Sequence, residues 1–237
     1  GLNVDTIGFH TSAGVVFLRN CNASGSADVT TTFGAASWIP LRGDWDQDAD
    51  ETVGVYDPST GCFFFKNTST PGAADEVVCF GPPGATPLVG DWDGNGTTTV
   101  GIYDAPTGTF YLKNTNAPGA ADLTFTFGGP NLTPLVGDWD GDGDTTIGVY
   151  NPGAGAFFLR NTNDAGFADL TFFYGAPGLM PLVGNWDGIA GDTVGVFNPG
   201  TGAYFLKNTN APGNADILFI FGVGGSVRPI AGNWDGF

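Results

Sequence analysis

Residues 136–150 have the sequence VGDWDGDGDTTIGVY, and versions of this stretch recur along the whole chain. The Trp-Asp pair at its centre appears five times, with successive pairs 47, 47, 47 and 48 residues apart, at Trp45, Trp92, Trp139, Trp186 and Trp234. A fixed period of this length is typical of proteins in which each repeat forms one supersecondary unit. The repeat therefore decides the architecture.

Each repeat contains four short runs of β-branched and aromatic residues, separated by Gly, Pro, Asn and Asp turn signals. In one repeat these runs lie at residues 87–88, 100–103, 110–114 and 122–128, and no helical pattern is present. A small four-stranded sheet can bury its faces only between neighbours, and this favours a closed ring of blades. We predict an all-β propeller with four antiparallel strands per blade.

The two ends of the chain indicate five blades. Residues 7–10 match the second strand of the other repeats, whereas residues 229–237 supply only a first strand and its loop. Together these fragments complete one repeat, so the ring is expected to close through a blade shared by both termini. We predict one domain over 1–237, with blades at 1–34 plus 229–237, 35–81, 82–128, 129–175 and 176–228.

Charge and hydropathy limit the class of partner. The 237 residues include 24 acidic and 7 basic side chains, for a formal net charge of −17. Proteins that bind nucleic acids or anionic membranes derive most of their affinity from Lys and Arg, so neither partner is expected. No apolar run is long enough to span a bilayer. Residues 1–20 lack a secretion signal, and we expect any signal to have been removed.

The acidic segment at residues 138–144 offers an oxygen ligand at alternate positions, with glycines that allow a sharp turn. Calcium prefers such hard carboxylate and carbonyl oxygens converging from a short loop. We predict that Asp138, Asp140 and Asp142 bind calcium through their side chains, and Asp144 through its carbonyl. The equivalent predicted ligands in the two preceding repeats are Asp44, Asp46, Asp48 and Asp50, and Asp91, Asp93 and Asn95.

The other loops are weaker candidates for calcium. The loop at 185–190 has lost two ligands, and the loop at 233–237 is split by the chain ends. In the Asp44 loop, Ala49 stands where a glycine is expected. The alternative for every loop is a turn whose carboxylates cap backbone amides without a metal.

The run at 136–143, continued by 147–152, resembles the FG-GAP or VCBS repeat of integrin-type propellers and many bacterial secreted proteins. Phe-Gly pairs at 33–34, 80–81, 127–128 and 221–222 fit the same pattern. The resemblance implies a calcium-binding propeller that acts outside the cell in adhesion or ligand binding. The family has an acid at the ninth loop position, where this chain has Thr52, Thr99, Thr146 and Thr193. Either calcium binds more weakly here, or an acid one place earlier, Glu51 or Asp192, substitutes.

Five of the seven bases occupy one repeat position, each followed by Asn and, nine residues on, by Asp: Arg19, Lys66, Lys113, Arg160 and Lys207. One interpretation is a cross-strand ion pair that helps to fix strand register. The alternative is five equivalent ligand sites that bind one sugar per blade.

Several single residues complete the set of candidates. Trp38 occurs only once and lies close to Arg42 in sequence, so we predict that these two contact a ligand. The tryptophan of each Trp-Asp pair is instead expected to pack between blades, because it recurs in every repeat. His10 occupies a position that holds Tyr or Phe elsewhere and is expected to fill an aromatic slot.

The three cysteines leave one unpaired. Aligning the third and fourth strands of the second repeat puts Cys62 nearly opposite Cys79, which allows either a disulfide or two buried thiols. Cys21 would then be free. A bridge would indicate an oxidising compartment.

These features predict a monomeric calcium-binding propeller, secreted or on the cell surface, whose partner is a glycan or a cell-surface protein. Catalysis has little support, because the single histidine and the absent nucleophile motifs leave no triad to assemble. One alternative is a calcium-dependent hydrolase of phosphoesters or lactones at the mouth of the central channel. Another is a structural spacer domain of a larger surface protein.

Overall fold

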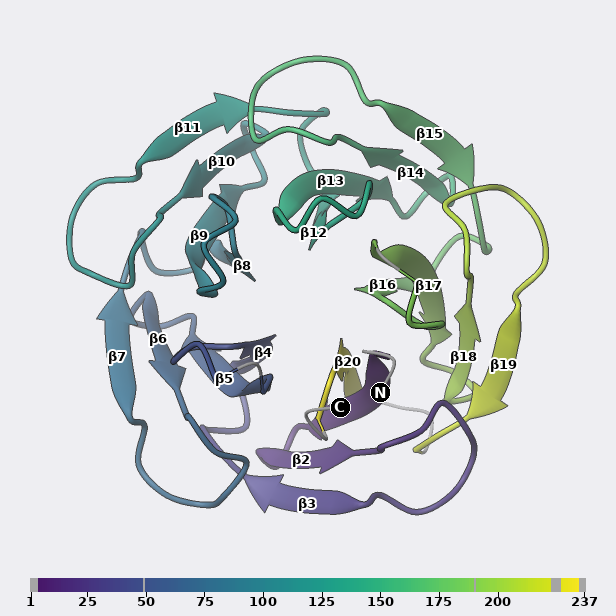
Figure 1. Ribbon diagram of the computed structural model, residues 1–237, viewed down its shortest axis with the longest axis horizontal. Helices are drawn as coiled ribbons and strands as arrows, with labels where there is room; N and C mark the ends of the chain where they lie inside the picture. The colour runs from purple at the N-terminus through teal and green to yellow at the C-terminus, as the bar shows by residue number, and fades with distance from the viewer. Residues whose placement is uncertain (1–3, 49, 190, 223–226, 235–237) are drawn as a thin grey trace.

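A computed structural model of the chain describes residues 4–48, 50–189, 191–222 and 227–234. Its secondary structure is entirely β, arranged as five four-stranded antiparallel sheets around a ring (Figure 1). The predicted five-bladed propeller is confirmed. The described part of the chain contains no helix that could cross a membrane.

Within each blade, the four strands follow one another from the channel outward. In that order, blade 1 contains β20 (Val227–Gly232), β1 (Thr6–Thr11), β2 (Val15–Leu18) and β3 (Val29–Thr32). Blade 2 contains β4 (Ile39–Gly43), β5 (Thr52–Asp57), β6 (Cys62–Phe65) and β7 (Glu76–Cys79). Blade 3 contains β8 (Thr86–Gly90), β9 (Thr99–Asp104), β10 (Thr109–Leu112) and β11 (Leu123–Thr126). Blade 4 contains β12 (Thr133–Gly137), β13 (Thr146–Asn151), β14 (Ala156–Leu159) and β15 (Leu170–Phe173). Blade 5 contains β16 (Met180–Gly184), β17 (Thr193–Asn198), β18 (Ala203–Leu206) and β19 (Ile217–Ile220).

Blade 1 closes the ring as predicted. Strand β20 supplies its innermost strand and pairs antiparallel with β1 from Thr6↔Gly232 to Thr11↔Val227. The first and last strands of the chain, β1 and β20, therefore belong to one sheet (Figure 1). Strand β20 begins at Val227, two residues before the boundary expected from the sequence.

The hydrophobic core is divided among the five blade interfaces. In the cluster between blades 2 and 3, Trp45 and Phe63 of blade 2 pack with Val100 and Ile102 of blade 3. The other four clusters join neighbouring blades in the same way. Burial of apolar surface thus holds each blade to the next, and no blade has a core of its own.

The recurring tryptophan explains two recurring glycines. Trp45 is buried and stacks on Phe65, with ring centroids 3.9 Å apart. A Cβ on Gly43 would lie 2.8 Å from the Trp45 ring, and one on Gly54 would lie 3.0 Å from it. A side chain at either position would collide with this indole, and also with Thr98 at Gly43 or Phe65 at Gly54, so the close packing here requires glycine. The prediction that these tryptophans pack between blades is confirmed for Trp45, Trp92, Trp139 and Trp186, which are buried in interface clusters.

Strand direction decides which loops share a face. Because the strands of a blade are antiparallel, the loops joining β4 to β5 and β6 to β7 open on the same face of the ring. The acidic loops and the loops that follow the basic residues therefore lie on one side. A cavity of about 680 Å³ occupies the central channel, and Asp44, Asp138 and Arg42 are among the residues that line it.

Candidate metal centre

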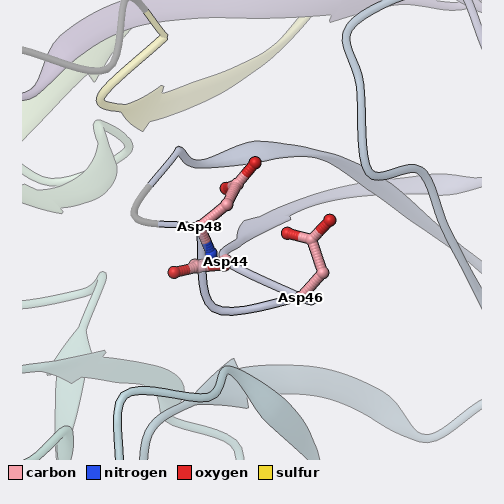
Figure 2. Close-up of side chains that lie close together, drawn as sticks. All are labelled: Asp44, Asp46 and Asp48. Atoms are coloured by element: carbon pink, nitrogen blue, oxygen red, sulfur yellow. Dashed lines mark hydrogen bonds between the residues drawn. The ribbon is translucent and has the colours of Figure 1, made fainter.

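The acidic segment of blade 2 forms a single turn between β4 and β5, and Asp44, Asp46 and Asp48 all project from it (Figure 2). Asp44 organises the turn, because its Oδ1 accepts the backbone N–H groups of Gln47 at 2.7 Å and Asp48 at 3.2 Å. Gln47 has a φ of +64°, which is uncommon for a residue with a side chain. Blade 4 has Gly141 at this position, with a φ of +80°.

The loop of blade 4 is capped in the same way. Asp138 Oδ1 accepts the N–H groups of Gly141 at 2.7 Å and Asp142 at 3.2 Å, while its Oδ2 accepts that of Gly143 at 3.0 Å. Such side-chain-to-backbone bonds favour the turn locally. The two loops therefore present their acids from a preset backbone.

Both loops bring three carboxylates together. One oxygen each from Asp44, Asp46 and Asp48 lie within 4.8 Å of one another, and so do oxygens from Asp138, Asp140 and Asp142. Oxygens bound to one calcium at roughly 2.3–2.6 Å can be at most about 4.6–5.2 Å apart. The two predicted sets of side-chain ligands thus have the spacing and the hard-oxygen chemistry that calcium requires.

Electrostatic repulsion within these loops favours a cation. Partial desolvation, together with the carboxylates of Asp48 and Asp44, raises the pKa of Asp46 above its ordinary value. The repulsion arises because like charges share a small volume, and a bound cation would relieve it.

The remaining predicted ligands lie differently. Asp50 and Asp144 each donate a backbone N–H to the third acid of their own loop, Asp48 or Asp142. The Asp144 side chain extends over the blade 3 loop, where a Cβ built on Gly94 would overlap its Oδ1. Desolvation and the acids of both loops, Asp142 first, raise the pKa of Asp144.

In blade 3, Asp91 accepts the N–H groups of Asn95 at 3.0 Å and Gly96 at 2.7 Å, so the turn keeps the same form. Asn95 Oδ1 accepts the Thr97 N–H at 2.8 Å. Asp93 completes the predicted set and is exposed. In blade 5, Asn185 replaces the first acid and caps Gly188. The loop that follows Trp234 and Ala49 of the Asp44 loop are not among the described residues.

Each acidic loop is gripped by the next blade. Asp44 donates its N–H to Thr98 Oγ1 at 3.1 Å, and its carbonyl accepts the Thr98 N–H at 2.9 Å. Asp91 and Thr145 form the same two bonds at 3.0 and 2.7 Å. We call this pair of bonds a clasp.

The clasp recurs with acids in place of threonine. Asp138 donates to Asp192 Oδ2 at 3.0 Å and Asn185 donates to Asp5 Oδ2 at 3.0 Å, and both carbonyls accept the return N–H. Asn233 donates to Glu51 Oε2 at 2.8 Å. Glu51 and Asp192 each accept a hydrogen bond from a neighbouring blade, and their substitution as ligands in their own loops stays a prediction.

Three of these clasp acids converge in the channel on Arg42, the charged member of a ring position that is Val or Ala in the other blades. Arg42 forms ion pairs with Glu51 and, at 3.7 Å, with Asp5. Burial lowers the pKa of Arg42, but Glu51 and Asp5 outweigh burial and hold it above its ordinary value. Arg42 therefore supplies a positive charge to the part of the channel wall where these acids lie.

The acids around Arg42 do not all ionise readily. Burial, with the charge of Asp5, raises the pKa of Asp192 to about 7, although Arg42 acts in the opposite direction. Burial also raises the pKa of Glu51. Burial and the neighbouring carboxylates thus raise the pKa of both acids, while the one guanidinium acts in the opposite direction.

The predicted ligand contacts Trp38 and Arg42 are not brought together. Trp38 precedes β4, is half-buried, and stacks on Phe64 with centroids 4.6 Å apart. Arg42 lies near the other end of β4, in the channel. The two side chains face different surroundings, and a ligand contact by either stays a prediction.

The five recurring basic residues each hold a loop of their own blade by hydrogen bonds. Every one of these side chains donates to the carbonyl seven residues further on: Ser26, Ala73, Ala120, Phe167 or Asn214. The backbone N–H of each following Asn donates to the predicted Asp at 2.8–2.9 Å. Ion pairs at 3.5–3.6 Å accompany these bonds for Arg19, Lys66 and Lys207, whereas Arg160 pairs with Asp164.

Three of these bases also reach the preceding blade, where Arg19, Lys113 and Lys207 lie 5.7–5.9 Å from the ring centres of Phe221, Phe80 and Tyr174. Their donor groups are thus engaged in holding loops and blades. This arrangement supports a structural role for the ring.

The remaining candidates also have defined places. Cys62 and Cys79 are register partners on β6 and β7 and form a disulfide, one of the two outcomes that the sequence allows, while Cys21 is exposed and free. His10 is buried on β1, as expected for an aromatic slot, and its pKa is lowered by burial and by Arg228.

Sequence reasoning missed the clasp at Asp5, Thr98 and Thr145. A signal was present, because the residue before the second strand is an acid or a threonine in all five repeats.

In comparisons with known proteins, no family model, curated protein or solved structure matches this chain. The resemblance to FG-GAP or VCBS repeats stays a prediction that rests on its motifs.

Proposed function

We propose that this chain is a calcium-binding propeller module that acts outside the cell and binds a glycan or a cell-surface protein. The observation that carries the metal part is the pair of carboxylate triads, Asp44–Asp46–Asp48 and Asp138–Asp140–Asp142, each with oxygens within 4.8 Å. Calcium bound there would neutralise the repelling carboxylates and stiffen the turn. The Asp91 loop, with Asp93 and Asn95, is the third proposed site.

Two properties support an extracellular setting. The Cys62–Cys79 bridge is of a kind that persists in oxidising compartments. The net charge of −17 disfavours nucleic acid and anionic lipid as partners.

Calorimetric calcium titration tests the metal part, with a matched pair of variants. Asp140→Asn removes a carboxylate from a triad, whereas Asp187→Asn makes the same change in the equivalent position of the degenerate blade 5 loop. We expect Asp140→Asn to abolish one binding event and Asp187→Asn to abolish none. Equal titrations for both variants and the unmodified chain would contradict the proposal.

The partner is tested by a glycan array and a cell-binding assay, each in calcium and in EDTA. We expect binding that is lost in EDTA and restored by calcium. No binding under either condition would leave the structural spacer as the better account.

A calcium-dependent hydrolase is the second candidate, because Asp44 and Asp138 both line the channel cavity beside Arg42. A metal at the channel mouth could polarise a phosphoester or lactone oxygen. Phosphoester or lactone turnover that disappears in Asp138→Asn would favour this candidate over the binding module.

A further inference from the structure

The first ligand of each proposed calcium loop is fixed by a residue from the next blade. Asp44 is held by Thr98, Asp91 by Thr145 and Asp138 by Asp192, in each case 54 residues further along the chain. Each clasp has two bonds, and only one of them uses the side chain. The clasp lies outside the ligand set but fixes the backbone of its first member.

Fixing that residue fixes the loop. Asp44 accepts the N–H groups of Gln47 and Asp48, and Asp138 accepts those of Gly141, Asp142 and Gly143. A rotation of the backbone at residue 44 or 138 would therefore move the whole turn and separate the carboxylates. Groups that hold metal ligands from outside the coordination shell commonly change metal affinity when removed.

We propose that Thr98, Thr145 and Asp192 are positioning residues for the calcium loops of the preceding blades. Each loop is thereby built from two blades: one supplies the ligands and the next supplies the acceptor that holds them in place. This inference rests on the proposed calcium site. A loop that is already ordered loses less conformational entropy when it binds a ligand, and the clasp acts through this preorganisation.

The blade 2 loop allows the sharpest test, because Thr98 can be changed without adding or removing charge. Thr98→Val keeps the shape and the backbone half of the clasp but removes the Oγ1 acceptor. Thr98→Ser restores an acceptor. Thr145→Val is the matched control, because it makes the same change in the clasp of a different loop.

The experiment uses the full chain carrying Asp93→Asn and Asp140→Asn, which leaves the Asp44 loop as the intact acidic loop. Terbium affinity is measured by luminescence sensitised by Trp45, and calcium affinity by competition. We expect Thr98→Val to weaken both affinities by about threefold to tenfold, the usual worth of one hydrogen bond. Thr98→Ser should restore most of the loss, and Thr145→Val should leave both affinities unchanged.

A second readout needs no metal. In EDTA, the Asp44 amide should exchange slowly in the unmodified chain and faster in Thr98→Val, since its N–H loses its acceptor. Thr98→Ala serves in the same assays if the valine does not fit.

The outcomes separate the two proposals. Unchanged affinity in Thr98→Val, or an equal loss in Thr145→Val, would overturn the positioning role while leaving the calcium site in place. No terbium or calcium binding by the unmodified chain would overturn the calcium site, and the inference with it, even if the Asp44 amide is protected.

Discussion

The two sides of the ring carry their acidic charge at different places in the repeat. Blades 2, 3 and 4 carry acids on the loop itself, and in blades 2 and 3 a neutral threonine clasps the loop. Around blades 5 and 1, where the ring closes (the closing side), Asn185 and Asn233 replace the first acid of the loop. Asp5 and Glu51 supply the clasp there. Arg42 then neutralises these two acids from within the chain. For the acidic loops, we propose that calcium plays this part.

The negative charge can lie at either of two repeat positions, the first residue of the loop or the clasp residue that holds it. Where the loop begins with Asn, the clasp is an acid, and where the loop begins with Asp44 or Asp91, the clasp is a hydroxyl. Asp138 and Asp192 break this pattern by combining an acid with an acid. The raised pKa of Asp192, about 7, comes from its burial and from the charge of Asp5, whereas the hydrogen bond from the Asp138 backbone lowers it.

The largest predicted difference between the acidic loops and the closing side is their response to calcium. At a free concentration one hundred times Kd, one bound ion stabilises its site by about 2.7 kcal/mol. We expect hydrogen exchange in residues 44–48 and 138–144 to slow in calcium, and exchange in residues 185–189 to stay unchanged. Asp140→Asn, measured in parallel, should remove the protection of 138–144 alone. Uniform protection of all loops would break the comparison.

Removal of the internal cation is the second test. Arg42→Met leaves Glu51 and Asp5 without their partner, and breaking a fully buried pair costs about 3–5 kcal/mol. Because the Arg42 side chain is 25% exposed, we expect a smaller loss of about 2 kcal/mol in the free energy of unfolding by urea.

The loss should be equal in calcium and in EDTA, because this side of the ring does not use the metal. The exposed Arg228 on β20 provides the control, and Arg228→Met should change stability by less than about 0.5 kcal/mol. Equal effects of the two variants would mean that Arg42 has no special role in closure.

The exception at Asp192 predicts a pH dependence. Its pKa is about 7 in the folded chain and close to 4 when unfolded, so the folded state takes up a proton first as pH falls. This contribution to stability is complete below the unfolded pKa and is lost as pH rises through 7. In EDTA, the unmodified chain should gain about 1 kcal/mol per pH unit on acidification from pH 7 to 5.

Asp192→Asn resembles the protonated acid and should flatten this slope, whereas Asp187→Asn should keep it. A slope that survives in Asp192→Asn would assign the proton to another group of the channel.

His10 predicts the smallest effect and the opposite sign. Burial and Arg228 lower its pKa, so its contribution to stability is present above about pH 6.5 and is lost as pH falls through the folded pKa. The free energy of unfolding is measured at pH 8 and at pH 5. From pH 8 to pH 5, His10→Phe should gain stability relative to the unmodified chain, by less than about 1 kcal/mol.

Tyr56→Phe alters the equivalent position of blade 2, and its effect should be the same at both pH values. An identical pH profile for His10→Phe and the unmodified chain would show that His10 does not titrate in this range.

The sequence predicts the fold well, because the 47-residue period, the complementary ends and the Trp-Asp motif all act locally or by repetition. The carboxylate triads and the Cys62–Cys79 bridge follow from spacing within one loop or one hairpin, and both can be predicted for the same reason.

The clasps were not predicted, although the acid or threonine before each second strand is visible in the sequence. Their partners lie 54 residues apart in the chain, or 180 for Asn185 and Asp5 and 182 for Asn233 and Glu51, and only the fold brings them together. The sequence suggests a ligand contact for Arg42 because it gives no sign of the two partners, Asp5 and Glu51, that the fold brings to this side chain. The basic ring reads as a set of ion pairs, yet its hydrogen bonds to loop carbonyls depend on loop geometry that no residue pattern specifies.

The central claim is that the acidic loops hold calcium while the closing side holds Arg42. Anomalous scattering from crystals grown in calcium tests it most directly. We expect peaks at the Asp44 and Asp138 loops, with carboxylate oxygens at about 2.3–2.6 Å, and none beside Asn185 or Arg42. Empty triads at saturating calcium, or a metal bound between Asp5 and Glu51, would contradict the account.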